Sequence, residues 1–156
     1  SKEMQNAITN YCQAGGNFFV SGAYVASDLW DNRLVKANEE DKKFAMEVLK
    51  YKWRVGQAAR NGKVKSVASP FPEITGSYTY YQDLNPESYV VESPDALEPA
   101  AQGAFTILRY SENNLSAGIA YKGNYKTCVL GFPFEAIRTV TERELLMKAI
   151  LTFFEH

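Results

Sequence analysis

The sequence has very little histidine and cysteine. Its only histidine is His156, the last residue, and its only cysteines are Cys12 and Cys128. Chain ends are usually frayed, so a catalytic histidine is not expected there. This scarcity argues against a Ser-His-Asp or Cys-His site within the chain, and against a zinc site of the usual kind. Both cysteines have apolar neighbours, which favours buried free thiols.

Basic clusters and long apolar runs are also missing. The net charge is −1, and no run of Lys or Arg exceeds two residues, so nothing provides the electrostatic footprint of nucleic-acid binding. No apolar stretch approaches the roughly 20 residues that span a bilayer. The G-x-S-x-G, phosphate-loop and G-x-G-x-x-G motifs are absent. We therefore expect no nucleic acid, no membrane span, no metal and no cofactor.

What the chain does contain is typical of one globular domain. Its 156 residues, 46% of them hydrophobic, are enough for a real core. Aromatic residues make up 13%, and strand and core packing explains them better than a ligand platform does. With no repeat, linker or low-complexity tract, we interpret residues 1–156 as a single domain. The opening helix has no strand before it, which favours a fragment of a larger protein.

Helices are predicted at both ends of the chain. Met4, Ile8 and Tyr11 share one helical face. Thr141 and Glu144 match a T-x-x-E capping box and predict that the last helix begins there, with Val140 and Leu145 as a hydrophobic staple. The predicted helices are 1–14, a short one within 23–30, 39–51 with Asn38 as N-cap, and the final segment with an apolar face of Leu145, Leu146, Ala149, Ile150, Phe153 and Phe154.

Between these helices the pattern favours strands. An early strand, 17–21, is apolar on both faces, which is typical of a strand that has a neighbouring strand on each side. We expect the isolated chain either to associate through that strand's open edge or to need a preceding segment. Asn61-Gly62 and Lys122-Gly123-Asn124 predict hairpins, and the Pro-rich stretch 84–103 predicts a loop. The later predicted strands are 53–58, 63–68, 76–81, 88–91, 104–110, 115–121 and 126–130.

A few polar and aromatic residues are candidates for a site. Asp28, Trp30 and Asp31 could line a cleft after the early strand. For the two Asp residues, capping or solvation is the preferred interpretation, and Trp30 could simply cover an apolar edge. Tyr78 and Tyr80 share one face of a predicted strand, where a sugar ring or a neighbouring strand would stack. Asp83 and Glu135 lie near element ends, where capping or solvation is the preferred interpretation.

Several strings resemble one family. GGNFFVSGAYVASDLW, KYKWRVGQA, KVKSVASPF, SENNLSAGIAYKGNYKTCVLGFPFE and RELLMKAILTFF are similar to the C-terminal region of bacterial secreted proteins named as xanthan lyases. That region resembles class I glutamine amidotransferases. The resemblance implies an α/β, flavodoxin-like three-layer sandwich, incomplete at its N-terminal side and carrying an added antiparallel β portion. It also implies a secreted, periplasmic or cell-surface location.

The same resemblance implies a degenerate active site. Active amidotransferases place a Cys nucleophile in a G-C-x-G turn after a strand, and a His and a Glu in a late F-H-P-E segment. Here the nucleophile position falls on Ala23 and, with Glu135 aligned, the His position falls on Pro133. A register shift of one would bring Ser21 or Tyr24 to the turn tip. An acid without a base or a nucleophile cannot run acyl transfer.

These observations favour a non-catalytic accessory or interaction module of a polysaccharide-related multidomain protein. Its partners would be other domains of the same parent protein, and a polysaccharide is a second candidate. The alternative is a carbohydrate-active lyase or hydrolase with a cleft near Gly22. A lyase needs a base beside the sugar's C5 proton and a group that neutralises its carboxylate. The catalytic candidates are Tyr24, Asp28, Arg109 and Glu135, with Tyr78 as an alternative base. The ligand-binding candidates are Ser21, Trp30, Tyr78 and Tyr80. A homo-oligomeric structural unit stays open as a third class.

Overall fold

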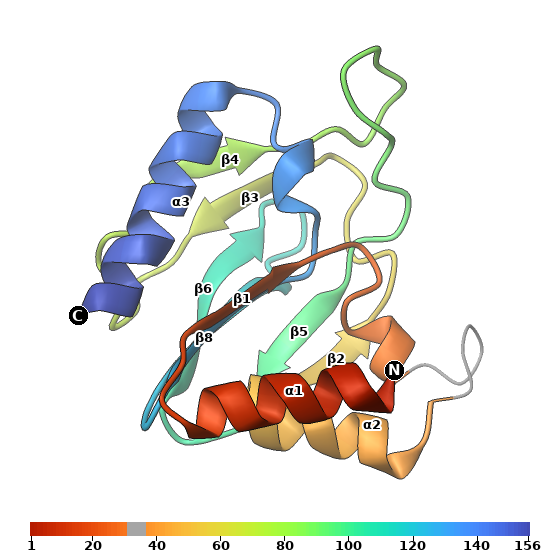
Figure 1. The fold of residues 1–156 in the computed structure, drawn as a ribbon. Coiled ribbons are helices and arrows are strands. Elements are labelled where there is room, and N and C mark those ends of the chain that lie inside the picture. The colour runs from red at the N-terminus through yellow and green to blue at the C-terminus, as the bar shows by residue number, and fades with distance from the viewer. Residues whose placement is uncertain (31–36) are drawn as a thin grey trace.

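The computed structural model describes residues 1–30 and 37–156 and shows a mixed α/β chain (Figure 1). The helical elements are α1 (Lys2–Gln13), η1 (Ser27–Leu29), α2 (Glu39–Phe44), η2 (Ala45–Leu49), η3 (Phe134–Ala136) and α3 (Val140–Glu155). The strands are β1 (Phe18–Ser21), β2 (Tyr51–Val55), β3 (Lys63–Ser66), β4 (Ser77–Thr79), β5 (Ala96–Pro99), β6 (Ala104–Tyr110), β7 (Ser116–Lys122) and β8 (Lys126–Leu130).

Six of the strands form one mixed sheet in the order β1-β8-β7-β6-β3-β4. Only β1 and β8 run parallel, with Phe19 opposite Cys128, and every other pair in this sheet is antiparallel. A separate antiparallel ribbon joins β2 to β5. The predicted α/β class is confirmed, and so is the hairpin through Lys122-Gly123-Asn124 that joins β7 to β8.

The sheet separates two hydrophobic clusters because successive side chains of a strand point to opposite faces. Phe19, Cys128 and Leu130 pack in the cluster that contains the apolar face of α3. Phe18, Val20 and Val129 belong to the other cluster, with α1, α2, η2 and the β2–β5 ribbon. Figure 1 shows α3 on one side of the sheet and α1 with α2 on the other. The architecture is therefore layered, with the sheet as the middle layer between the two clusters.

The helix starts follow capping rules, with one correction. Asn38 caps α2, as predicted, and also forms a capping box with Asp41. The helix then widens into a π-turn that ends at Lys50, whose φ is +68°. The cap of α3 is Thr139 rather than Thr141, because the Glu142 amide donates to Thr139 Oγ1 at 3.1 Å. The predicted staple is also wrong, since Val140 and Leu145 are both exposed.

Three predictions about strands fail, and the first two fail because strand pairing here is not local. Asn61-Gly62 does form a turn, with Gly62 at φ +63°, but it joins β2 and β3, which lie in different sheets. The Pro-rich stretch 84–103 contains β5, whose Ala96 and Leu97 are fully buried against β2 and the main sheet. Residues 88–91 form no strand.

β1 is an edge strand, and among residues 1–30 and 37–156 its one strand neighbour is β8. The Gly22 amide donates to Leu130 O, so alternate amides of β1 face β8 and those of Phe19 and Ser21 face away. Within the described residues these outward groups have no backbone partner. The opposite edge, β4, is covered, because Arg138 N–H donates to Thr79 O and Tyr80 bridges to Ile137. All four residues of β1 are half-buried, less covered than the sequence pattern predicts.

Across residues 1–30 and 37–156, no helix combines the length and hydropathy that crossing a membrane would require.

Candidate functional site

The carboxyl ends of parallel strands meet at one edge of a sheet, and this is where α/β proteins commonly bind ligands. Here the turn after β1 and the segment after β8 lie against each other. Gly22 N–H donates to Leu130 O at 3.3 Å, and Phe134 N–H donates to Ser21 Oγ at 3.1 Å. This contact brings the two segments predicted to matter, 21–30 and 131–135, into one place.

Asp95 is the charged residue buried at this edge. It precedes β5, is 0% exposed, and accepts four hydrogen bonds. Its Oδ2 accepts from Ala26 N–H at 2.9 Å, Ser27 N–H at 3.0 Å and Ser27 Oγ at 3.3 Å. Its Oδ1 accepts from Trp53 Nε1 at 3.1 Å. One carboxylate therefore joins the turn after β1 to the β2–β5 ribbon.

The backbone of Asp95 is hydrogen-bonded as well as its side chain. Its amide donates to Gly131 O at 2.7 Å, and its carbonyl accepts from Tyr110 Oη at 2.7 Å. Gly131 must be glycine here, because a Cβ would lie 2.0 Å from Asp95 O. Burial raises the pKa of Asp95 to about 6, although its four donors oppose the shift. No cationic side chain within the described residues bonds to it.

A groove of about 250 Å³ opens beside this edge, between α1 and the turn after β1. Tyr24 and Asp28 come from the turn, and Met4 and Gln5 come from α1. The rest of its lining is mainly apolar: Ile8, Phe18, Val20, Val25, Leu29, Phe44 and Leu49, with Ser1 at the chain end. The groove lies next to the predicted cleft position but does not include Gly22, and it is a small, mainly apolar groove with one carboxylate, that of Asp28.

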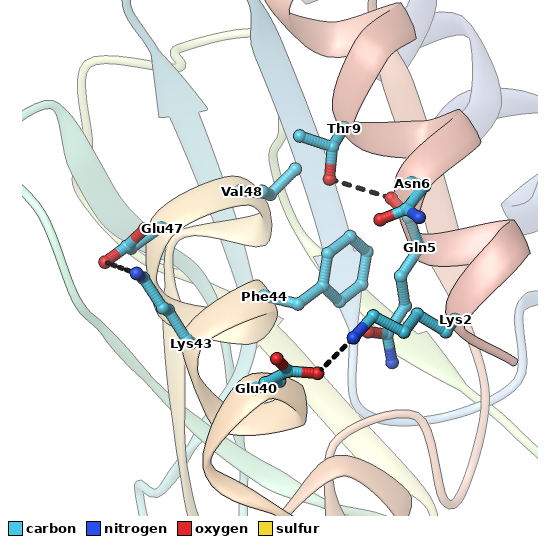
Figure 2. A pocket seen from close by; sticks show the side chains of 9 residues that line it. All are labelled: Lys2, Gln5, Asn6, Thr9, Glu40, Lys43, Phe44, Glu47 and Val48. Carbon is cyan, nitrogen blue, oxygen red and sulfur yellow. Dashed lines mark hydrogen bonds and ion pairs between the residues drawn. The ribbon is translucent and has the colours of Figure 1, made fainter.

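On its other side α1 forms a second, polar cleft of about 260 Å³ with α2 and η2 (Figure 2). Lys2 Nζ donates to Glu40 Oε2 at 2.5 Å, and Lys43 lies 4.0 Å from Glu47. In Figure 2 the Lys2–Glu40 pair lies below Phe44 and the Lys43–Glu47 pair lies to its left. All four charged side chains are well exposed, so each pair adds little stability. The cleft brings no acid and base together around a buried point.

Of the predicted site residues, the structure brings Tyr24 and Asp28 together in the groove. Ser21 does not line it, and its hydroxyl oxygen accepts a hydrogen bond from Phe134 N–H instead. Trp30 is half-buried, and the Lys42 ammonium lies 6.0 Å from its ring centre. This contact matches the simpler interpretation of Trp30 as cover for an edge. Asp31 lies outside the described residues.

Tyr78 and Tyr80 are not on an accessible face, which corrects their assignment as ligand-binding residues. They are 3% and 0% exposed and belong to the cluster beneath α3. Tyr80 stacks on Phe132 with ring centres 4.9 Å apart, and Tyr78 donates to Thr75 O. The alternation seen in the sequence is therefore that of a half-buried strand. Burial raises the pKa of both phenols, so neither suits a general base.

Arg109 and Glu135 do not join the groove. Arg109 Nη1 donates to Asn114 O at 2.8 Å within the β6–β7 hairpin, and Glu135 accepts from Tyr89 Oη at 2.7 Å on the surface. Neither lines the space that Tyr24 and Asp28 share. Arg109 and Glu135 therefore do not supply the cation or the base that a lyase would need in this groove.

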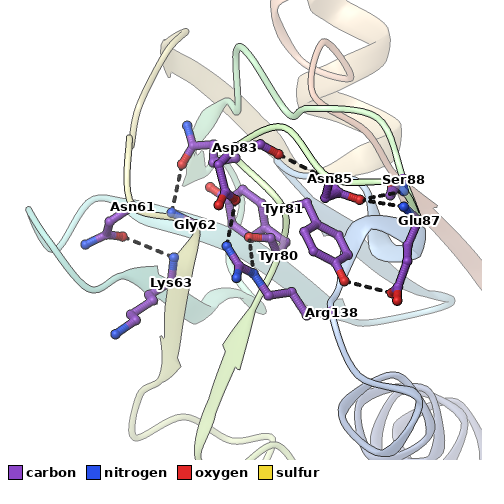
Figure 3. A network of polar contacts seen from close by, with 11 residues as sticks. Asn61, Gly62, Lys63, Tyr80, Tyr81, Asp83, Asn85, Glu87, Ser88 and Arg138 are labelled. Carbon is purple, nitrogen blue, oxygen red and sulfur yellow. Dashed lines mark hydrogen bonds and ion pairs between the residues drawn. The ribbon is translucent and has the colours of Figure 1, made fainter.

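A further polar network anchors the loop after β4 (Figure 3). Arg138 lies 5.0 Å from the ring centre of Tyr81 and donates to Asp83 at 2.8 Å, while Tyr81 Oη donates to Glu87 at 2.8 Å. Figure 3 shows these groups paired with one another at the loop base. Leu84, beyond them, is 93% exposed. The network explains why the predicted loop has a defined shape.

Sequence reasoning missed Asp95. Its only signal is an acidic residue between Pro94 and the apolar pair Ala96-Leu97, and Pro-rich surroundings favour a loop. Cys12 and Cys128 are free and buried, as predicted. In the part of the chain that the structure describes, no three side chains of metal-binding type converge.

Comparisons with known proteins address the fold. No protein-family model matches the chain, and no curated protein matches it. Among solved structures, the chain is similar to part of a cold-adapted β-galactosidase from Rahnella sp. R3, with a TM-score of 0.61, 13% identity, and coverage of 97% of this chain and 20% of that one. It is also similar to part of the exo-β-1,4-mannosidase Op5Man5 from Opitutaceae bacterium strain TAV5, with a TM-score of 0.53, 9% identity, and coverage of 98% and 22%. The chain thus spans about a fifth of either enzyme and shares with each a domain-sized fold.

Proposed function

We propose that this chain is a non-catalytic accessory domain of a larger, carbohydrate-active protein, in which it packs against the other domains. The observation that carries the proposal is the state of the edge where β1 and β8 end. Each polar side chain that the edge brings together there is already engaged: Ser21 with Phe134, Asp95 with four donors. Nothing in this set is free to act as a nucleophile or a base.

The structural neighbours support the carbohydrate context. Both are glycoside hydrolases by name, and almost the whole of this chain aligns with about a fifth of each. A unit of this size within a long enzyme is commonly a separate domain. We extend this to a secreted, periplasmic or cell-surface parent protein, on the strength of the resemblance to secreted xanthan lyases.

The resemblance to class I glutamine amidotransferases, with its flavodoxin-like sandwich, belongs to the same proposal. It requires the turn after the first strand and the segment after a late strand to face each other, and the Ser21–Phe134 contact supports that requirement. At this place Ala23 packs against the core and Pro133 is buried. Under this alignment the catalytic Cys and His are replaced by side chains with no chemistry, which leaves a scaffold.

Glutamine hydrolysis tests the degenerate-site part of the proposal. We expect the purified chain to release ammonia from glutamine no faster than buffer, and Ala23→Cys to behave in the same way because no base accompanies the new thiol. An active glutaminase serves as the control for the assay. Ammonia release by the unmodified chain above the buffer rate would overturn the proposal.

A carbohydrate-active lyase or hydrolase is the second candidate. The groove beside β1 favours it, because Tyr24 and Asp28 share that space and are partly exposed. Its weakness is the lining, which offers apolar side chains where a sugar needs hydrogen-bond partners. Under this second candidate, Tyr24→Phe and Asp28→Asn would abolish cleavage of a polysaccharide.

A further inference from the structure

The outward side of β1 carries backbone groups that have no partner among the described residues. Gly22 N–H donates to Leu130 O, and β1 pairs in regular register with β8. The backbone groups of Val20 therefore face β8, and those of Phe19 and Ser21 face away from it. All residues of β1 are half-buried, so solvent still reaches this strand. The amides and carbonyls of Phe19 and Ser21 are in place to pair with one further strand.

The apolar groove between α1 and the turn after β1 borders the same strand. Phe18 and Val20 of β1 form one wall of it, and Met4 and Ile8 of α1 form another. Met4 is 63% exposed, and Cys12 is the one buried residue of α1, so the apolar side of this helix has little cover. A strand laid along β1 would place every second side chain on the face that carries the groove.

We propose that β1 and this groove form a docking site for an extended strand, which a part of the parent protein outside this chain supplies. Backbone pairing with Phe19 and Ser21 provides the affinity, and alternate apolar side chains that enter the groove provide the selectivity. Among the described residues that line the groove, Asp28 alone has a charged side chain, and it is exposed. A basic residue at one end of the strand complements that carboxylate.

The source of the strand rests on the proposed function, in which this chain packs against other domains of a larger protein. The chain aligns with about a fifth of each structural neighbour, so a parent protein of similar size has ample further chain to supply a strand. A second copy suits the site less well. Antiparallel pairing of two β1 strands about a two-fold axis keeps the α1 faces of both sheets on one side, which brings each α1 toward the groove of the other copy.

Hydrogen exchange of the purified chain, followed by NMR, tests the site. The probe is a short synthetic peptide that alternates valine with threonine and carries a lysine at each end. Without peptide, the amides of Phe19 and Ser21 should exchange faster than those of Val20 and Gly22, which face β8. Saturating peptide should slow exchange at Phe19 and Ser21 by at least about fivefold, the effect of one hydrogen bond. The same peptide with every backbone amide methylated should have no effect.

Two matched pairs of variants test the edge and the groove separately. Ser21→Pro removes one outward amide, and it should bind the peptide about fivefold more weakly than Ser21→Ala, which loses the same hydroxyl but keeps the amide. Met4→Lys places a charge in the groove wall and should weaken binding. Asn10→Lys adds the same charge at an exposed position of α1 outside the groove and should not. The second pair keeps the test decisive if Ser21→Pro fails to fold.

Three results would overturn the docking site. They are no binding of the peptide at millimolar concentration, binding that leaves the amides of Phe19 and Ser21 unprotected, and self-association through β1 that saturating peptide does not reverse. The last result would make a second copy the preferred occupant. None of them bears on the absence of catalysis, which is measured with glutamine and polysaccharides. Conversely, cleavage of a polysaccharide would remove the proposed function and leave the peptide result unchanged.

Discussion

At the residue scale, single side chains decide how segments of this chain meet. Thr139 caps α3 and also contacts Glu142 Oε2 at 2.6 Å, while Glu142 Oε1 accepts from the Thr79 amide. One cap thus links the last helix to the edge of the sheet. Asp95 does the same for β1 and the β2–β5 ribbon. Both links depend on side-chain oxygen atoms that accept hydrogen bonds from backbone amides.

Replacing Thr139, the N-cap of α3, should reduce the stability of the fold, and replacing Thr141, the predicted cap, should not. We expect Thr139→Ala to lower the free energy of unfolding by about 1 kcal/mol, through loss of the bond from the Glu142 amide. Thr141→Ala is the matched control, since Thr141 lies inside the first turn of α3. Chemical denaturation measures both. If the control lost more stability than Thr139→Ala, the cap assignment would be wrong.

The pKa of Asp95 predicts how stability changes with pH. A carboxyl whose pKa rises from 3.8 in the unfolded chain to about 6 in the folded one binds more protons when folded. It therefore stabilises the fold below its unfolded pKa, and this contribution is lost as pH rises through about 6. The loss amounts to roughly 3 kcal/mol. Denaturation across this range should show that decline in the unmodified chain and a smaller one in Asp95→Asn; equal declines would refute it.

At the scale of elements, α3 contributes the best-defined apolar face. Leu146, Ala149, Ile150 and Phe153 are buried, and the ring centres of Phe153 and Phe71 lie 4.4 Å apart. Helical spacing predicts this face correctly from the sequence. It also includes Leu145, which is 57% exposed, because periodicity alone does not show how wide the covered stripe is.

Neighbouring leucines of α3 provide a matched test of this packing. We expect Leu146→Ala to cost about 2–4 kcal/mol of unfolding free energy, because a fully buried side chain leaves a cavity. Leu145→Ala should change it by less than about 0.5 kcal/mol. Denaturation of the two variants under identical conditions decides. Similar costs for both would mean that α3 sits on the sheet in a different rotation.

Local signals predict most elements, and pairing decides the rest. The capped helix α2, the strand β1 and the β7–β8 hairpin follow from patterns confined to a few residues. The strand β5 was hidden because Pro94 precedes it and Pro99 ends it, and only its pairing with β2 and its burial reveal it. The site shows the same limit. Asp95 could not be recognised from the sequence, because its hydrogen-bond donors Ala26 and Ser27 lie almost seventy positions away.

At the scale of the whole molecule, the sheet is closed at one edge and open at the other. The segment around Arg138 covers β4, whereas the outward amides of Phe19 and Ser21 face no strand among the described residues. No charged residue, proline or bulge protects residues 18–21. Such an edge accepts a further strand.

This open edge predicts association of the isolated chain. We expect its mean mass in sedimentation equilibrium to rise with concentration, because unpaired strand edges favour pairing. The measurement needs only several loading concentrations of the unmodified chain. A mass that stays at that of a monomer over the whole range, with high two-state stability, would show that these residues satisfy their own edge.

The central claim, a domain without chemistry of its own, is tested most directly by polysaccharide cleavage. The purified chain is incubated with xanthan, a β-linked galactan and a β-linked mannan, and new sugar ends are measured against buffer. The account predicts no release above buffer for the unmodified chain. It is contradicted if the chain cleaves one of these polymers and Tyr24→Phe or Asp28→Asn abolishes the reaction while Leu145→Ala, a surface control, retains it.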